Sequence, residues 1–171
     1  MAYRRPEPLA KHHRLDTFAC GKPALDEWLV RHARSAHASD SARVYVTTIE
    51  DGEAVDGYYA LAAAQVAPQD APARARQGQP RARPVPAIIL ARLAVDHHHQ
   101  RAGVGRSLLQ DAVLRCVTAA EAIGARLLLV HAKHAAAKAW YQQYGFEESP
   151  TGPLHLQILM KDLRAQLDHS E

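Results

Sequence analysis

Residues 87–107 of this 171-residue chain read AIILARLAVDHHHQRAGVGRS. Residues 87–95 are a nearly continuous apolar run, which is typical of a central strand buried on both faces. A polar loop follows, and apolar side chains then recur at helical spacing over residues 103–123. Residues 126–130, RLLLV, predict another apolar strand. A strand, a helix and a strand in this order predict parallel pairing with a right-handed crossover.

The rest of the chain predicts shorter elements around this unit. We expect helices at residues 23–38 and 135–144, strands at 44–49, 54–63 and 154–160, a further strand beginning at Phe146, a hairpin turn at 50–53 and a loop at 67–86 with room for one short helix. Gly57 is the candidate for a bulge in its strand. Because no internal repeat or linker divides the sequence, we expect residues 1–171 to form a single α/β domain with its core at about 43–163.

The composition is that of an ordinary globular protein. Hydrophobic residues make up 47% of the chain and charged residues 23%, which excludes a wholly disordered, collagenous or coiled-coil chain. No apolar run reaches the roughly 18 residues that a membrane helix needs, and the N-terminus contains no apolar stretch typical of a secretory signal. Two cysteines cannot build a disulfide framework. We therefore expect no membrane partner and a cytoplasmic location.

Positive charge is concentrated in one part of the sequence. The formal net charge is only +3, but no acidic residue lies between Asp70 and Asp96. The same stretch holds five arginines: Arg74, Arg76, Arg81, Arg83 and Arg92. Two interpretations stay open, a solvated arginine-rich loop and a surface for a phosphate-rich partner.

The turn between the buried strand and the long helix is the strongest local motif. Residues 100–107 read QRAGVGRS, and their glycines allow a ligand to approach the backbone closely. The first N–H groups of the helix and its dipole would together bind a pyrophosphate. A tight turn into a structural helix explains the same glycines. The turn is not a GxxxxGK phosphate loop, because no Lys-Ser/Thr pair follows the glycines. It is also not a complete GxGxxG fingerprint, since residue 108 is Leu.

A second motif follows the next strand, where residues 140–146 read WYQQYGF. Tyr141 stands 38 residues after Gly103. With a strand between them, both can face one cleft at the carboxyl edge of the sheet. The alternative is that Trp140 and Tyr141 simply pack on the sheet.

These motifs resemble the GNAT family of acetyl-CoA-dependent N-acetyltransferases. The resemblance rests on Gln100-x-x-Gly103-x-Gly105 after LARLAVD and on Tyr141-x-x-x-Gly145-Phe146, and it spans about residues 43–160. It implies a mixed, mostly antiparallel sheet flanked by helices, with one parallel strand pair splayed apart to admit acetyl-CoA. No metal is expected.

The resemblance also implies roles for individual residues. The turn would hold the CoA pyrophosphate with Gln100, Arg101, Ala102, Gly103, Val104, Gly105, Arg106 and Ser107. The preceding strand would pair with the pantetheine arm and place Leu93 and Val95 beside it. Tyr141 would protonate the leaving thiolate.

A narrower resemblance is to the toxins of GNAT-type toxin–antitoxin systems. It rests on residues 18–29, 57–61 and 90–96. It implies acetylation of the α-amine of aminoacyl-tRNA, which stops translation, and an antitoxin with a ribbon-helix-helix domain. The aminoacyl group and the formation of a homodimer stay open. One departure is that the turn often reads Q-G-x-G-x-G in these toxins, whereas Arg101 replaces the first glycine here.

Charged tRNA would bring phosphates to the mouth of the site. Arg81 and Arg83 in the acid-free loop and Arg92 near the strand edge are the candidates for RNA contacts, because arginine binds phosphate oxygens bidentately.

The residues themselves favour an acceptor amine of low pKa. Strand 87–95 offers no carboxylate that could act as a base, and Asp96 suits the following turn better. An α-amine, with a pKa of about 7.7–8.0, is partly neutral already. A protein N-terminus or a small-molecule amine fits this chemistry equally well. A non-catalytic CoA- or RNA-binding module is a rival of another class.

The histidines and cysteines give weaker signals. Three adjacent histidines, residues 97–99, project in divergent directions, so we expect a polar loop there and no metal site. His131 and His134 either line the cleft or cap the next helix. Cys20 and Cys116 are expected to be structural.

Overall fold

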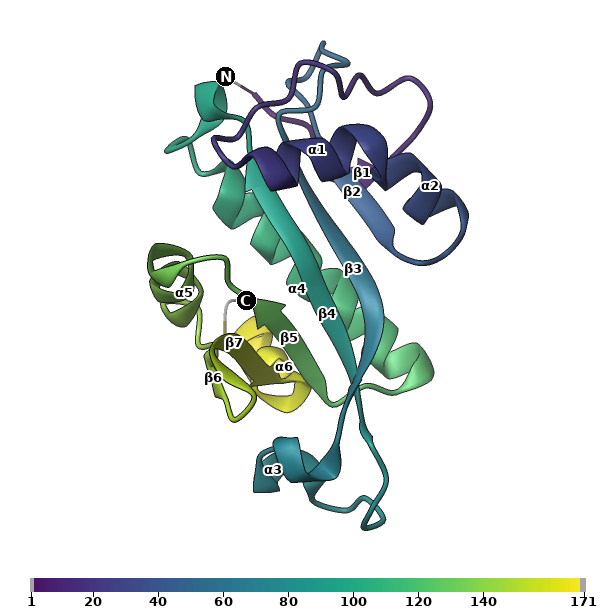
Figure 1. Cartoon of the computed structure of the whole chain (residues 1–171), viewed down its shortest axis with the longest axis vertical. Coiled ribbons are helices and arrows are strands. Elements are labelled where there is room, and N and C mark those ends of the chain that lie inside the picture. The colour runs from purple at the N-terminus through teal and green to yellow at the C-terminus, as the bar shows by residue number, and fades with distance from the viewer. Residues whose placement is uncertain (1, 170–171) are drawn as a thin grey trace. The chain divides into compact units, whose positions relative to one another are not determined.

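The computed structural model describes residues 2–169 and contains one mixed sheet with the strand order β1-β2-β3-β4-β5-β7-β6 (Figure 1). The strands are β1 Glu7–Pro8, β2 Arg43–Thr47, β3 Gly57–Val66, β4 Val85–Val95, β5 Leu127–His131, β6 Glu147–Ser149 and β7 Gly152–Leu159. The helices are α1 Pro23–Arg31, α2 Ala33–Ala38, α3 Ala73–Arg76, α4 Val104–Ile123, α5 Ala135–Gln142 and α6 Met160–Asp168, with short 3-10 turns η1 Pro68–Asp70 and η2 His97–His99. No helix among these described residues is long and apolar enough to cross a membrane.

The predicted strand–helix–strand unit is confirmed. β4 and β5 pair in parallel from Ala87 opposite Leu127 to Leu90 opposite Val130, and α4 connects them. β4 continues to Val95, beyond the end of this pairing. β1–β2, β2–β3, β5–β7 and β6–β7 are antiparallel, so the sheet is mixed and mostly antiparallel as expected.

The chain divides into two compact units, and β3, β4 and α4 contribute to both. The first unit contains the described residues up to Ala62 together with Ala91–Ala112. The second contains Ala63–Leu90 and the described residues from Val113 onward.

The core of the first unit forms where α1 packs on β2 and β3. Leu25 and Leu29 are the buried residues of α1. The Tyr58 hydroxyl donates a hydrogen bond to the Leu25 carbonyl at 2.7 Å, and the Trp28 ring stacks on Tyr58 with centroids 6.0 Å apart. Phe18 adds an edge-on contact at 5.4 Å. These contacts attach the segment before α1 to the sheet.

The single helix predicted at residues 23–38 is wrong in one respect, because it breaks at His32. That residue has φ −121°, outside the helical range, and separates α1 from α2. Contacts of α2 explain its different direction. The His37 ring nitrogen Nδ1 accepts the Val44 N–H at 3.0 Å, and the Arg34 guanidinium donates to the Ala10 and His13 carbonyls.

The connection between β2 and β3 is also longer than the predicted four-residue turn. β2 ends at Thr47 and β3 begins at Gly57. Gly57 pairs in register with Thr47, so it forms no bulge. A Cβ at Gly57 would lie 2.9 Å from Leu108 Cδ1, and the glycine therefore permits close approach of α4.

The core of the second unit lies around β5. Its buried members are Val66, Ala71, Ala75, Val85, Ala87, Leu127 and Leu129. The Arg126 guanidinium donates to the Ala75 and Gln77 carbonyls, which holds the end of α3 within the long loop. The sequence did not predict α6, which buries Met160 and Leu163 and pairs Asp162 with Arg74 at 3.0 Å.

The turn into α4 uses left-handed backbone. Arg101 has φ +63° and Gly103 has φ +82°. Glycine adopts this conformation freely, whereas a side chain with a Cβ costs roughly 1–2 kcal/mol there. Arg101 thus occupies the position where the related turn pattern has glycine, and it does so with backbone strain.

We predict that Arg101→Gly is more stable than Arg101→Ala by about 1 kcal/mol, because only glycine adopts the left-handed conformation without a Cβ contact. Urea unfolding of the two variants measures the difference. Both lack the guanidinium group, so the comparison isolates the backbone. Equal free energies of unfolding would contradict the strain assigned to this turn.

Candidate active site

The predicted pyrophosphate turn forms an exposed helix N-terminus in the first unit. The Ser107 N–H donates to the Gly103 carbonyl at 3.1 Å, which is the first hydrogen bond of α4. The N–H groups of Val104, Gly105 and Arg106 therefore have no partner within the helix. A Cβ built on Gly103 would meet nothing within 4 Å, so the space beside this residue is open. Arg101 and Ala102 complete the turn and are exposed.

Asp96 fixes the turn at its start, as the N-cap of η2. Its Oδ2 accepts the Ala19 N–H at 3.0 Å, and its Oδ1 accepts the His98 N–H at 3.0 Å. Burial by itself would raise the pKa of Asp96, but these backbone donors hold the pKa below its ordinary value. Asp96 is thus an ionised cap, which confirms its predicted place in the turn.

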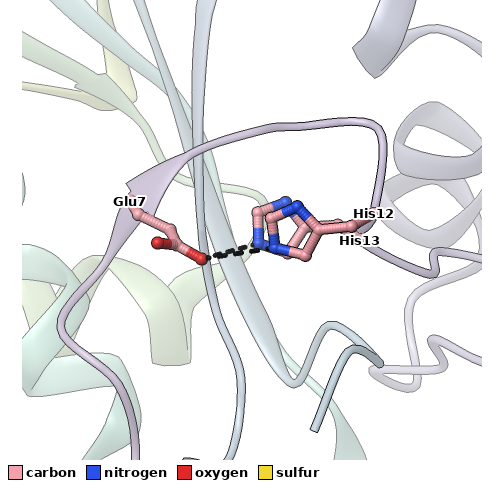
Figure 2. Close-up of side chains that lie close together, drawn as sticks. All are labelled: Glu7, His12 and His13. Atoms are coloured by element: carbon pink, nitrogen blue, oxygen red, sulfur yellow. Dashed lines mark hydrogen bonds and ion pairs between the residues drawn. The ribbon is translucent and has the colours of Figure 1, made fainter.

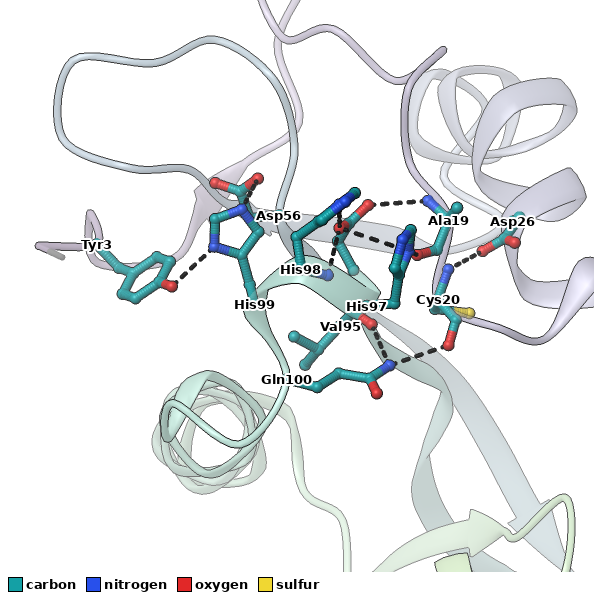
Figure 3. Close-up of polar contacts among 11 residues, drawn as sticks. Tyr3, Ala19, Cys20, Asp26, Asp56, Val95, His97, His98, His99 and Gln100 are labelled. Atoms are coloured by element: carbon teal, nitrogen blue, oxygen red, sulfur yellow. Dashed lines mark hydrogen bonds and ion pairs between the residues drawn. The ribbon is translucent and has the colours of Figure 1, made fainter.

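Gln100 also holds the turn. Its Nε2 donates to the Cys20 carbonyl at 3.0 Å and to the Val95 carbonyl at 2.9 Å (Figure 3). This amide joins the end of β4 to the segment before α1. Its contact with the cofactor stays a prediction.

The last residues of β4 alternate between two faces of the sheet. Ala94 is buried in the core beneath α1, whereas Leu93 and Val95 are partly exposed on the opposite face. Arg92 lies on the same face as Ala94, with its guanidinium carbon 4.2 Å from the centroid of the Trp28 ring. Burial lowers the pKa of Arg92, although arginine stays a cation at neutral pH. Leu93 and Val95 are therefore available to a ligand.

Tyr141 belongs to the second unit and lies on α5. It is 7% exposed, and its ring makes edge contacts with Trp140 at 5.0 Å and Phe146 at 5.6 Å. Burial raises the pKa of the Tyr141 hydroxyl above its ordinary value. The group therefore stays protonated at neutral pH, and it can act as a proton donor. The same ring contacts also fit the alternative in which Tyr141 packs on the sheet.

The structure distinguishes the two histidines that precede α5. His134 caps the helix, because its Nδ1 accepts the Ala137 N–H at 3.2 Å. His131 instead stacks on His155, its register partner across β5 and β7, with ring centroids 3.9 Å apart. Burial, and then the charges of His155 and Lys133, lower the pKa of His131.

The arginines of the acid-free loop differ in whether they already have an acidic partner. Arg74 is paired with Asp162, whereas Arg81 and Arg83 are exposed. The Gln79 amide donates to the Arg83 and Pro84 carbonyls, which shapes the loop around these two residues. Arg92 belongs to the first unit and the loop to the second.

Two groups of histidines and carboxylates lie close enough to suggest metal ligands. In the first, Glu7 Oε1 accepts a hydrogen bond from His13 Nε2 at 2.8 Å, and His12 lies beside them (Figure 2). His13 Nδ1 accepts the Ala10 N–H, so the proton of the neutral ring is on Nε2. A metal at that nitrogen would have to displace this proton and the bond to Glu7.

The second group consists of Asp96, His97 and His98. Asp96 already accepts two backbone N–H groups. His97 Nδ1 donates to the Ala19 carbonyl at 2.7 Å. These hydrogen bonds engage the atoms that could otherwise bind a metal, and they shape the polar loop that the sequence predicted.

Both cysteines are buried and unsuited to nucleophilic chemistry. Burial, reinforced by Asp26, raises the pKa of Cys20 to about 11, and burial raises the pKa of Cys116 to about 12. They remain thiols at neutral pH.

Comparison with known proteins gives consistent matches. Residues 40–148 match the acetyltransferase (GNAT) domain family. A tRNA-acetylating toxin of Mycobacterium tuberculosis is 47% identical over 163 residues, which cover 95% of this chain and 96% of that protein.

Solved structures agree with this relationship. AtaT complexed with acetyl-methionyl-tRNAfMet has a TM-score of 0.87 and 25% identity, covering 96% of this chain and 99% of that chain. A tyrosine-to-phenylalanine variant of AtaT, bound to the C-terminus of the antitoxin AtaR and to acetyl-CoA, has a TM-score of 0.79 and 25% identity over 98% and 99% of the two chains. The resemblance found in the sequence is thereby confirmed, and the chain belongs to the GNAT family of acetyltransferases.

Proposed function

We propose that this protein transfers the acetyl group of acetyl-CoA to the α-amino group of aminoacyl-tRNA and so blocks translation, as the toxin of a toxin–antitoxin pair. The observation that carries the proposal is the 47% identity, over 95% of the chain, to a tRNA-acetylating toxin. The likeness to AtaT in complex with acetyl-methionyl-tRNAfMet supports the same substrate class.

The turn before α4 binds the pyrophosphate of acetyl-CoA in this proposal. The N–H groups of residues 104–106 point out of the helix, where its dipole adds partial positive charge. Leu93 and Val95 line the pantetheine arm from the exposed face of β4. The remaining cofactor residues are Gln100, Arg101, Ala102, Gly103 and Ser107. Bound acetyl-CoA supplies an activated thioester.

Tyr141 acts as the general acid. The neutral α-amine attacks the thioester carbonyl carbon, a C–N bond forms and the C–S bond breaks. Tyr141 gives its hydroxyl proton to the departing sulfur. The proton that the amine loses passes to solvent, and Tyr141 regains its proton from solvent. Burial raises the pKa of Tyr141, so the hydroxyl still carries its proton throughout the neutral range when the sulfur departs.

Arg81, Arg83 and Arg92 contact tRNA phosphates in this proposal. Arg81 and Arg83 are exposed on the long loop, where a duplex or single-stranded end can reach them. Arg92 is already ordered over Trp28, so it loses less side-chain freedom on binding.

The proposed function also implies where the protein acts and which protein it binds. We place the protein in the cytoplasm, where charged tRNA is found, and treat residues 1–171 as one catalytic domain. The partner in this proposal is an antitoxin with a ribbon-helix-helix domain. The structure of AtaT bound to the C-terminus of its antitoxin AtaR supports an antitoxin as the partner. Sedimentation of the isolated protein tests whether a homodimer forms.

We predict that Tyr141→Phe lowers the rate of acetyl transfer to charged tRNA by roughly 10²–10⁴-fold, because it removes the acid but keeps the ring. Acetyl-CoA affinity should be retained. Single-turnover assays and calorimetry measure the two quantities. Tyr144→Phe is the matched control, since Tyr144 contacts the same Trp140 ring at 5.2 Å. An unchanged single-turnover rate would assign Tyr141 to packing alone.

The pH dependence should follow the substrate amine. Because burial raises the pKa of Tyr141, the acid stays protonated as the pH rises from 6 to 9, while the α-amine becomes neutral near its pKa of about 7.7–8.0. Initial rates at low charged-tRNA concentration should therefore rise up to about pH 8 and then level. A decline between pH 7 and 9 in the wild type that disappears in Tyr141→Phe would contradict this assignment.

We predict that replacing Arg81 and Arg83 together by alanine raises the KM for charged tRNA and flattens its salt dependence, because two phosphate contacts are lost. Acetyl-CoA affinity should not change. The control variant replaces Arg31 and Arg43 by alanine. It removes the same amount of positive charge, but these two arginines are paired with Glu27 and Asp40. Identical salt slopes in wild type and the loop variant would remove this loop from RNA binding.

A further inference from the structure

His99 connects two distant parts of the first unit just before the pyrophosphate turn. Its Nε2 lies 3.1 Å from Asp56 Oδ1, and its Nδ1 lies 2.8 Å from the Tyr3 hydroxyl oxygen (Figure 3). The Tyr3 ring also contacts the imidazole edge-on, with centroids 5.5 Å apart. The side chains of His99 and Asp56 are only 14% and 11% exposed. We call Tyr3, His99 and Asp56 the N-terminal latch.

Hydrogen-bonding rules fix the direction of the bond between His99 and Asp56. Asp56 Oδ2 accepts the Ile49 N–H at 3.0 Å, and an ionised carboxylate can only accept. His99 Nε2 therefore donates to Asp56. In the neutral ring, Nδ1 then accepts from the Tyr3 hydroxyl. Every polar group of the latch has a partner, although its members come from three separate segments of the sequence.

Asp56 holds the short 3-10 turn η2 at both ends. Its carbonyl accepts the Asp96 N–H at 2.8 Å, directly before η2, and its carboxylate holds His99, the last residue of η2. Gln100 and the left-handed Arg101 follow at once. A strained residue persists only where its surroundings over-determine its conformation, and the latch supplies such surroundings.

We infer that Tyr3, His99 and Asp56 are positioning residues for acetyl-CoA, and that the N-terminal segment is therefore a working part of the cofactor site. This inference rests on the proposed binding of acetyl-CoA at the turn. The latch touches no reacting atom. It fixes where η2 ends, and hence where the N–H groups at the start of α4 point.

The latch can be weakened without removing the N-terminal segment. The Arg4 N–H donates to the Thr48 carbonyl at 2.8 Å, and Tyr3 pairs with Ile49 in an antiparallel bridge. These backbone contacts remain when Tyr3→Phe deletes only the hydroxyl. His99→Leu removes both side-chain bonds and serves as the second variant.

Each variant should raise the Kd for acetyl-CoA by about twofold to tenfold for each hydrogen bond that it loses. The kcat at saturating acetyl-CoA should stay close to the wild-type value. Because Tyr3 acts through His99, the double variant should bind no more weakly than His99→Leu alone. His12→Gln is the control, since His12 is an exposed histidine of the same segment that lies beside Glu7, at 3.8 Å, and the His13 ring, with centroids 4.1 Å apart, outside the latch.

Calorimetric titration with acetyl-CoA alone, with circular dichroism to establish folding, tests the inference. Folded Tyr3→Phe and His99→Leu proteins that bind acetyl-CoA with wild-type Kd would overturn it. A loss of kcat in proportion to the unfolded fraction, with Kd unchanged, would reduce the latch to a structural role and overturn it as well. Weaker binding in the variants, beside a wild type that cannot acetylate charged tRNA, would support the latch and reject the proposed reaction.

Discussion

The parallel pairing of β4 with β5 is the constraint on which the rest of the structure depends. Two parallel strands cannot be joined by a tight turn, so the chain must cross over through α4. The crossover places a helix N-terminus directly after β4, with N–H groups that the helix itself does not satisfy. The binding proposed for this turn therefore relies on the backbone. Side chains such as Asp96 and Gln100 serve to hold that backbone in place.

Elements governed by local pattern could be predicted from the sequence. The apolar run of β4, the helical periodicity of α4 and the left-handed Gly124 that ends it are examples. Elements that depend on distant partners could not. The break at His32 depends on contacts of α2 with distant residues, such as the bond from the Val44 N–H to His37. The helix α6 is a different case, because Met160, Leu163 and Leu167 do recur at helical spacing, and the strand expected at 154–160 concealed this local pattern.

The same division applies to the candidate site. The pyrophosphate turn and Tyr141 carry short motifs, so their positions were evident in the sequence. The partners of His99 could not be predicted, because Tyr3 and Asp56 lie 96 and 43 residues away and no spacing rule joins them. The contact of Arg92 with Trp28 is hidden for the same reason. Sequence motifs thus located the candidate site, whereas the structure identified the side chains that hold its backbone in place.

The two tryptophans of the chain give the protein a built-in pair of optical reporters. Trp28 packs on Tyr58 beneath the Arg92 cation in the first unit, and Trp140 lies beside Tyr141 in the second. Each indole therefore senses a different environment. Fluorescence of single-tryptophan proteins can follow the loss of structure in each unit separately, and so show whether the two units unfold as one cooperative body.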